Sequence, residues 1–184
     1  MERAVFLDRD GVINRDVRTY VRSWDEFEFL PGVRAALVKL AKSDFKVFVV
    51  SNQAGVGKGL LDLNTLDVIT NNMLGEIEQA AGRVDAVKYC PHRSDENCAC
   101  RKPKTGLFQQ ILRQRKIDVA ASFMVGDSER DMAAGRELGL KTILVLCGHI
   151  KDKKETVDFK VKPDYISRDL LDAVDNIILK DEQQ

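Results

Sequence analysis

Short apolar runs alternate with longer amphipathic stretches along the 184 residues of the chain. Each run has four or five residues and is mostly apolar, which is typical of strands buried on both faces of a parallel sheet. The predicted strands are Ala4–Leu7, Lys46–Val50, Ala86–Tyr89, Ser122–Val125 and Thr142–Leu146, followed by a shorter one at Asp164–Ile166.

Between the runs, apolar residues recur at helical spacing. The expected helices are Gly32–Lys42, Asp62–Ala81, Thr105–Arg115, Glu129–Leu138 and Asp169–Leu179. Pro31 stands before the first helix and Gly139 after the fourth, where these residues favour a helix start and a helix end. Strands that alternate with helices predict βαβ units. We therefore expect an α/β fold, a Rossmann-like parallel sheet with helices on both faces, forming a single domain over residues 1–184.

Three longer connections interrupt this alternation. Asn14–Leu30 is polar, Gln53–Leu61 is a Gly-rich turn that we interpret as a flexible rim, and Tyr89–Lys104 contains cysteines and a histidine. Each follows a predicted strand, so all three should emerge at the carboxyl edge of the sheet, where open α/β sheets bind ligands. None is long enough for a separate cap domain, so we expect an open site.

Charge and hydropathy exclude two classes of partner. Lys plus Arg and Asp plus Glu each number 29, so the net charge is zero, and a chain that binds nucleic acid usually carries a basic excess. The apolar run at the start is too short for a signal peptide, and no later run approaches a membrane span. We expect a cytoplasmic protein, a monomer, with neither nucleic acid nor membrane as a partner.

The first motif whose side chains could take part in catalysis or metal binding is Asp8-Arg9-Asp10-Gly11, directly after the first predicted strand. Carboxylates at positions i and i+2 of an extended chain point the same way, and two such charges need a cation or a shared proton. An Asp-rich turn is the ordinary alternative. A calcium loop is excluded, because Val12 stands where that loop requires a third acid.

Three further motifs follow strands or precede helices. Ser51-Asn52 offers a hydroxyl and an amide, Arg101-Lys102 offers cations, and Gly126-Asp127 is followed by Asp131. Each alone also fits a plain role: a turn, a solvated surface charge, or an acid near a helix start. The glycines after Asn52 match neither the P-loop nor the dinucleotide-binding pattern.

A separate cluster, Cys-x-His-x5-Cys-x-Cys, occupies a loop at about residues 89–104. Three thiolates and an imidazole suit tetrahedral Zn²⁺, and four protein ligands leave no open position, so the metal should be structural. Unligated cysteines or a redox pair are the alternative. The expected zinc ligands are Cys90, His92, Cys98 and Cys100. Zinc here would hold the loop that continues into Arg101 and Lys102.

In the order D-x-D-G, S-N, K-P and G-D-x-x-x-D, the motifs resemble the haloacid dehalogenase superfamily of phosphatases over nearly the whole chain. The resemblance implies that Asp8 is the nucleophile, forming an aspartyl phosphate, and that Asp10 is the general acid and then the general base. It also implies Mg²⁺ held by the Asp8 carboxylate, the Asp10 carbonyl and Asp127, with Asp131 behind these ligands. The implied phosphate-binding residues are Ser51, Asn52 and Lys102.

The Cys/His cluster directly before Arg101-Lys102-Pro103 is similar to two branches of that superfamily, the D-glycero-D-manno-heptose-1,7-bisphosphate phosphatases and the histidinol-phosphate phosphatases. Gly106 and the stand-alone chain favour the heptose branch. The substrate-binding residues then implied are Asp16, Tyr20, Gln53, Arg101 and Ser128, with Arg18 or Arg22 as helpers toward a second phosphate.

The chain departs from that pattern twice. Asp16–Tyr20 is longer by a residue than the corresponding segment and lacks its glycine, and Ser128 stands where the best-known heptose enzymes carry Lys. Histidinol phosphate or another sugar phosphate are alternative substrates. A catalytically silent binding module is disfavoured, because Asp8, Asp10, Lys102 and Asp127 are all present. A nucleic-acid-end phosphatase is disfavoured by the zero net charge.

Overall fold

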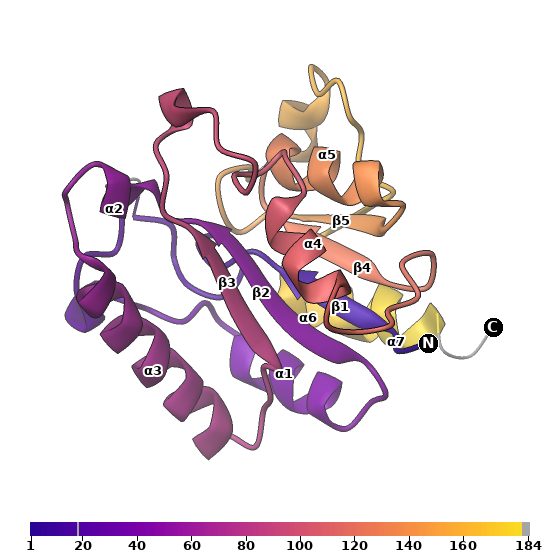
Figure 1. The fold of residues 1–184 in the computed structure, drawn as a ribbon. Coiled ribbons are helices and arrows are strands. Elements are labelled where there is room, and N and C mark those ends of the chain that lie inside the picture. Colours follow the sequence, from indigo (N-terminus) through magenta and orange to yellow (C-terminus); the bar gives the residue numbers. More distant parts are fainter. Residues whose placement is uncertain (18, 182–184) are drawn as a thin grey trace.

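The computed structural model describes residues 1–17 and 19–181, and it contains a six-stranded parallel sheet in the order β3-β2-β1-β4-β5-β6 (Figure 1). The strands are β1 (Ala4–Leu7), β2 (Lys46–Asn52), β3 (Ala86–Cys90), β4 (Phe123–Gly126), β5 (Lys141–Val145) and β6 (Tyr165–Ser167). The predicted parallel sheet is confirmed; the bounds of β1 are those predicted, and those of the other strands differ by at most two residues.

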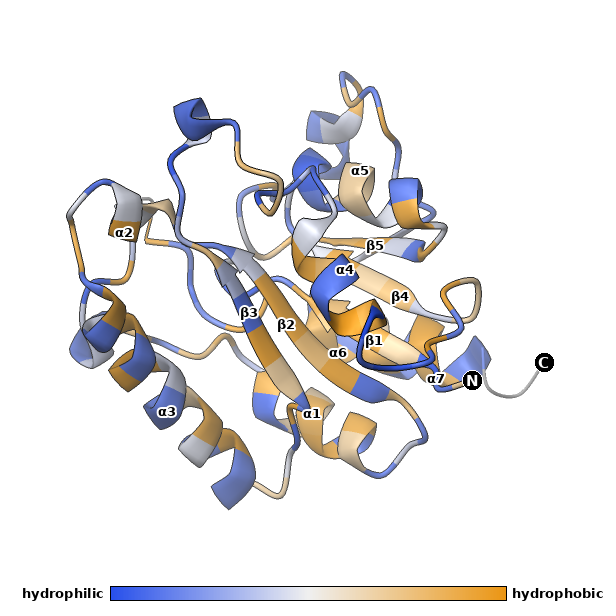
Figure 2. Ribbon diagram, viewed as in Figure 1, coloured by the Kyte–Doolittle hydropathy of each residue, from blue (hydrophilic) through white to orange (hydrophobic). Residues whose placement is uncertain are grey.

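Strand β1 lies in the middle of the sheet because it is apolar on both sides. All four of its residues are fully buried. Val5 and Leu7 belong to the core cluster on one face, and Phe6 belongs to the cluster on the other, where its ring lies 5.2 Å from that of Phe108. Figure 2 shows the same apolar character in the neighbouring strands. Alternating side chains of a doubly covered strand therefore supply two cores.

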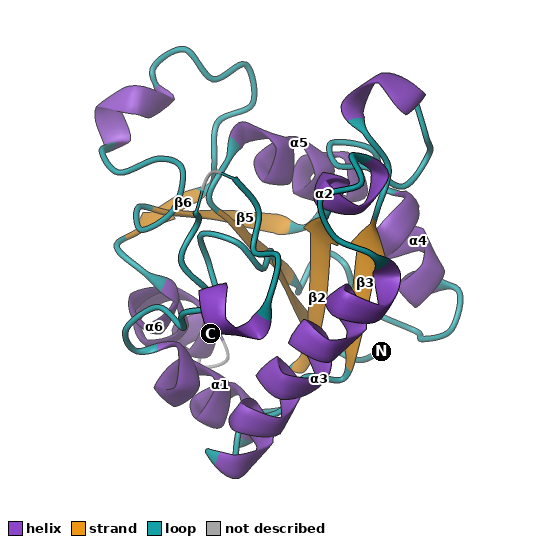
Figure 3. Ribbon diagram, turned by 90° about the vertical axis from the view of Figure 1, so that its left-hand side faces the viewer, coloured by secondary structure: helices purple, strands orange, loops and turns teal. Residues whose placement is uncertain are grey.

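Helices cover both faces of the sheet (Figure 3). Residues of α1 (Val33–Ala41), α3 (Leu63–Gln79) and α6 (Leu170–Ala173) pack in the first core, and residues of α4 (Gly106–Leu112) pack in the second. Residues of α5 (Glu129–Leu138) contribute to the second core and to a smaller cluster beside β5. Helix α6 continues through a π-helical turn, Val174–Ile178, into α7 (Leu179–Asp181).

The Gly-rich segment after β2 corrects one expectation. It contains a short helix, α2 (Ala54–Gly57), rather than a flexible rim. The Gly57 amide donates to the Pro91 carbonyl at 2.9 Å, and Ala54 and Gly55 are buried. This hydrogen bond ties the segment to the loop after β3, so its backbone polar groups are satisfied by ordered partners.

The strand order reverses between β1 and β4, and this reversal locates the ligand site. Chain segments after β1 run to β2 and β3 on one side, whereas β4, β5 and β6 follow on the other. Loops at the carboxyl ends of β1 and β4 must therefore diverge, which opens a crevice between them. Within the described residues, the first loop contains only a short 3₁₀ turn, Trp24–Glu26, so no folded insert covers the crevice. No described helix is both long and apolar enough to cross a membrane.

Candidate active site

A pocket of about 540 Å³ lies at the carboxyl edge of the sheet, where β1 and β4 end. Of the described residues that the sequence predicted for catalysis, phosphate, magnesium and sugar, only Gln53 and the helper Arg22 do not line it. The predicted residues that line it are Asp8, Asp10, Asp16, Tyr20, Ser51, Asn52, Arg101, Lys102, Asp127, Ser128 and Asp131.

Asp8 follows the last residue of β1 and enters the pocket from the middle of the sheet. Its Oδ1 accepts hydrogen bonds from the Arg9 amide at 2.7 Å and lies 3.1 Å from Lys102 Nζ. Burial raises the pKa of Asp8 and the charge of Asp131 adds to this, while Lys102 and the Ser51 hydroxyl act in the opposite direction. Asp8 is therefore a poorly hydrated carboxylate held in place by a cation, as a nucleophile toward phosphorus requires.

Lys102 is almost wholly buried between two acids. Its Nζ lies 2.6 Å from Asp131 Oδ1 and 3.1 Å from Asp8 Oδ1, and it donates to the Val50 carbonyl at 2.7 Å. Burial alone would lower the pKa of Lys102, but the charges of Asp131 and Asp8 outweigh it and raise that pKa. The three acceptors match the three donors of an ammonium group. The pocket thus carries a fixed positive charge beside Asp8.

Asn52 holds the backbone of Lys102 from the end of β2. Its Oδ1 accepts from the Lys102 amide at 2.9 Å, and its Nδ2 donates to the Lys102 carbonyl at 3.1 Å. The sequence predicted Asn52 as a phosphate ligand; in the structure its amide faces this backbone while its residue still lines the pocket. Asn52 therefore places the lysine.

Three carboxylates converge on one spot that suits a divalent cation. Oxygen atoms of Asp8, Asp127 and Asp131 lie within 4.8 Å of one another, and such hard donors are those that Mg²⁺ prefers. Burial raises the pKa of Asp127 to about 8, with the charges of Asp131 and Asp8 adding to the effect. A cation would remove this repulsion. Because Asp131 is occupied by Lys102 and by Ser128 at 2.6 Å, Asp8 and Asp127 remain as the metal-facing pair.

The backbone around Asp127 leaves room for its carboxylate and for nothing larger. Gly11 has a φ of +80°, and a Cβ on it would lie 2.1 Å from Asp127 Oδ2. A Cβ on Gly148 would lie 2.2 Å from the same oxygen. The His149 amide donates to that oxygen at 2.6 Å. Two close backbone approaches thus fix the carboxylate, as expected of a metal ligand that must not move.

Asp10 has a different environment from Asp8. Its carboxylate receives hydrogen bonds from the Arg9 guanidinium at 2.8 Å, Asn14 Nδ2 at 2.8 Å and Gln53 Nε2 at 2.6 Å. Burial alone would raise the pKa of Asp10, but the Arg9 charge and these hydrogen bonds outweigh it, so that pKa is lowered. Gln53 is fully buried behind the pocket wall. The expected contact of Gln53 with substrate is therefore replaced by a contact with Asp10.

Of the other residues predicted to bind sugar, Asp16, Tyr20 and Arg101 are partly exposed in the pocket lining, whereas Ser128 is buried there. Tyr20 adopts a φ of +73°, which bulky residues rarely do, and Arg101 makes one hydrogen bond, to the His92 carbonyl at 3.3 Å. The Ser128 hydroxyl donates to Asp131. Arg22 pairs with Glu26 and lines no pocket wall, and Arg18 lies outside the described residues.

Four residues of the site were not predicted. Arg9 and Asn14 hold Asp10, and His149 and Arg130 line the pocket. Two of them carry a signal in the sequence: Arg9 lies between the two acids of the first motif, and Arg130 precedes Asp131 at the same sheet edge. His149 had no such signal, because the loop after β5 carries no recognisable motif.

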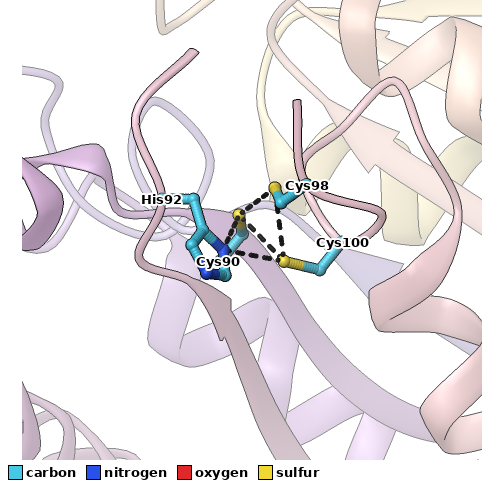
Figure 4. A group of neighbouring side chains, drawn as sticks. All are labelled: Cys90, His92, Cys98 and Cys100. Carbon is cyan, nitrogen blue, oxygen red and sulfur yellow. Dashed lines mark hydrogen bonds between the residues drawn. The ribbon is translucent and has the colours of Figure 1, made fainter. Parts of the chain in front are cut away.

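The Cys/His loop gathers its four predicted ligands (Figure 4). Cys100 Sγ lies 3.1 Å from Cys90 Sγ, 3.6 Å from Cys98 Sγ and 3.2 Å from His92 Nδ1. Zn–S bonds of about 2.3 Å and a Zn–N bond of about 2.0 Å give tetrahedron edges of roughly 3.5–3.8 Å, close to these separations. A disulfide requires about 2.0 Å. The donor set therefore fits zinc.

Comparisons with known proteins agree with this geometry. Residues 99–173 match a family model described as HAD-hydrolase-like. A D-glycero-beta-D-manno-heptose-1,7-bisphosphate 7-phosphatase of Bordetella bronchiseptica is 41% identical over 147 residues, covering 80% of this chain and 82% of the relative. One of Haemophilus ducreyi is 37% identical, covering 94% of this chain and 97% of the relative. The chain belongs to this family of haloacid dehalogenase-like phosphatases.

Solved structures of the family share the whole fold. The crystal structure of the D,D-heptose 1,7-bisphosphate phosphatase from B. bronchiseptica, complexed with magnesium and phosphate, superposes with a TM-score of 0.89 at 35% identity, covering 97% of this chain and 99% of that one. The corresponding enzyme from Burkholderia thailandensis gives a TM-score of 0.71 at 33% identity, covering 94% and 96%. The phosphatase fold predicted from the motifs is confirmed.

Proposed function

We propose that this protein removes the 7-phosphate from D-glycero-β-D-manno-heptose 1,7-bisphosphate. The observation that carries the proposal is the convergence of Asp8, Asp127 and the Lys102–Asp131 ion pair in one polar pocket. The choice of substrate follows the relatives compared above, which are named as 7-phosphatases of this heptose bisphosphate. Arg101 at the pocket mouth supports a substrate with a second phosphate.

The reaction we propose has two steps on Asp8. The Asp8 carboxylate attacks phosphorus, the bond to the sugar oxygen breaks, and Asp10, which enters this step protonated, gives that oxygen its proton. Water then attacks the aspartyl phosphate, and Asp10 takes a proton from this water, releasing inorganic phosphate. Ser51 and Lys102 hold the phosphoryl oxygens while their charge develops. To act this way, Asp10 exchanges one of its present hydrogen bonds for the sugar oxygen.

Magnesium would be held by the Asp8 and Asp127 carboxylates and the Asp10 carbonyl, and when bound it neutralises charge on the transferring phosphoryl group. Asp131 would orient Lys102 without binding the metal. Zinc would be held by Cys90, His92, Cys98 and Cys100 in the loop at about residues 89–104. We propose that this zinc is structural and that residues 1–184 act as one domain. The four cysteines form no disulfide, which supports a location in the reducing cytoplasm.

Phosphate release from a substrate panel tests the proposal. Wild type with Mg²⁺ should hydrolyse the β-anomer of the heptose bisphosphate with a higher kcat/KM than the α-anomer or histidinol phosphate. Asp8→Asn should retain less than about a hundredth of the activity, because an amide is a poor nucleophile. Faster hydrolysis of histidinol phosphate would overturn the substrate but not the Asp8 mechanism. Appreciable activity in Asp8→Asn would overturn that mechanism.

A further inference from the structure

A second pocket, of about 280 Å³, adjoins the catalytic pocket and has the opposite charge. Five aspartates line the catalytic pocket, whereas no carboxylate lines the second. The cations of the second pocket are Arg101, Lys102, Lys104 and Arg130. Three of them, Arg101, Lys102 and Arg130, line both pockets and so form their shared boundary. A pocket walled by cations without acids is suited to an anion.

Among the cations of this pocket, only Arg130 has a side chain that no described protein group binds. Lys102 is held by Asp8 and Asp131, Arg101 binds the His92 carbonyl, and Lys104 binds Asn97. Within residues 1–17 and 19–181, the exposed Arg130 side chain makes no hydrogen bond and no ion pair. Its five N–H donors are therefore available to a ligand.

The acids adjacent to Arg130 in the sequence are already occupied. Glu129 accepts hydrogen bonds from the Lys160 and Val161 amides, and Asp131 binds Lys102 and Ser128. Arg130 also lies in the first turn of α5, where the helix dipole disfavours a cation. What distinguishes Arg130 from other unpaired surface arginines is that it lines both pockets, so a ligand that spans their boundary can reach it.

We propose that Arg130 binds the second, unreacting phosphate of a bisphosphorylated sugar in this cationic pocket, and so determines the preference for a bisphosphate over the matching monophosphate. The inference rests on the sugar-phosphate phosphatase activity proposed above. While one phosphate faces Asp8, the remote phosphate lies at the boundary with Arg101, where a guanidinium grips two of its oxygens. Ser128 precedes the same helix, but its hydroxyl donates to Asp131 and carries no charge, so Arg130 is the residue here that can bind the remote phosphate.

Matched kinetics test this assignment. We would measure kcat/KM for heptose 1,7-bisphosphate and heptose 7-phosphate, and for fructose 1,6-bisphosphate and fructose 6-phosphate, with wild type, Arg130→Ala, Arg130→Lys and Arg130→Glu. Arg130→Ala should lower kcat/KM for the bisphosphate about 10- to 100-fold, mainly through KM, and change the monophosphate less than about threefold. Lys should restore part of the preference, and Glu should reduce it further.

Arg113→Ala is the matched control. Arg113 is also exposed, its side chain has no hydrogen bond or ion pair in the described part of the chain, and it lines neither pocket, so its loss should change neither substrate. Equal effects of Arg130→Ala on bisphosphate and monophosphate would overturn the assignment, as would a wild type that prefers no bisphosphate. An Arg130-dependent preference seen only with the fructose pair would support Arg130 while overturning the heptose substrate.

Discussion

Asp8 and Asp10 are two residues apart, yet their surroundings prepare them for different work. Asp8 faces one shared lysine and two other carboxylates, so burial and like charge dominate its environment. Asp10 is surrounded by donors, from Arg9, Asn14 and Gln53. The first carboxylate is poised to react once a cation is present, and the second is held in one orientation by hydrogen bonds.

This contrast predicts a distinct result for Asp10→Asn. An amide can accept the same hydrogen bond from Asn14 but cannot transfer a proton, so kcat should fall about 10²- to 10⁴-fold. The aspartyl phosphate should accumulate if its hydrolysis slows more than its formation. Intact-protein mass spectrometry after rapid mixing with substrate checks this, with Asp8→Asn as the variant that shows no added phosphate. Near-normal turnover by Asp10→Asn would exclude its acid–base role.

Single-residue reasoning from the sequence identified the reactive groups and misjudged those that orient them. Asp8 and Asp127 stand in spaced motifs at strand ends, and Lys102 stands in a motif shortly before a helix. Gln53 shares such a place, but its fully buried side chain donates to Asp10 and Ser51 instead of lining the pocket. Which polar group a side chain binds depends on the tertiary structure around it, which a sequence motif does not encode.

At the scale of elements, the loop after β3 delivers two catalytic-pocket cations, and it is anchored at two places. The Cys/His cluster folds its first part, and Asn52 from β2 binds the backbone of Lys102. Between β3 and α4, the described loop contains only a 3₁₀ turn, Ser94–Glu96, as regular secondary structure, so these two anchors hold it in place. The backbone position of Lys102 therefore depends on the Cys/His cluster and on the Asn52 amide.

Cys98→Ser should remove this first anchor. The purified wild type should contain about one zinc per chain, and the variant should lose it, with a Tm lower by at least about 5 °C and a reduced kcat. Plasma emission spectrometry and calorimetry measure both effects. Cys147→Ser, which changes the cysteine outside the cluster, should keep its zinc. A zinc-free protein with unchanged Tm would contradict a structural metal.

The loop after β5 approaches Asp127 closely with its backbone at Gly148. Gly148→Ala would place a methyl group against Asp127 Oδ2 and displace the carboxylate. We expect kcat/KM to fall roughly 10-fold or more and the Mg²⁺ concentration for half-maximal activity to rise. Gly75→Ala in α3 is the control, because its Cβ meets open space. That change should leave activity intact and stabilise the fold by about 0.5–1 kcal/mol.

Elements were easier to predict than the contacts between them. A short apolar run such as Ala4–Leu7 predicts a buried strand without knowledge of which strands pair with it. The α2 helix was missed because its sequence, Ala-Gly-Val-Gly, has poor helix propensity; a hydrogen bond from Gly57 to Pro91, distant in sequence, holds it. Tertiary partners of this kind leave no periodic signal in the chain.

At the scale of the whole molecule, one feature of topology organises the chemistry. The sheet places β4 directly beside β1, which brings Asp8 and Asp127 together at the carboxyl ends of these strands. The two strands are far apart in sequence: Ala4 and Ser122, which are hydrogen-bonded near their other ends, are separated by 118 residues. The end of β2 and the loops that follow β3 and β5 line the same pocket. Since no described segment caps it, the pocket admits polar, extended substrates from solvent.

The burial of Lys102 has a consequence for covalent labelling. An acylating reagent attacks a neutral, accessible amine, whereas the Lys102 ammonium has all its donors filled and is 2% exposed. Brief treatment of the native protein with an acetylating ester, followed by peptide mapping, should modify the exposed Lys58 and leave Lys102 unmodified. In denaturant both should react. Acetylation of Lys102 at the rate of Lys58 in the native protein would mean that the ion pairs open readily; protection would make this lysine resistant to reagents that acetylate the surface.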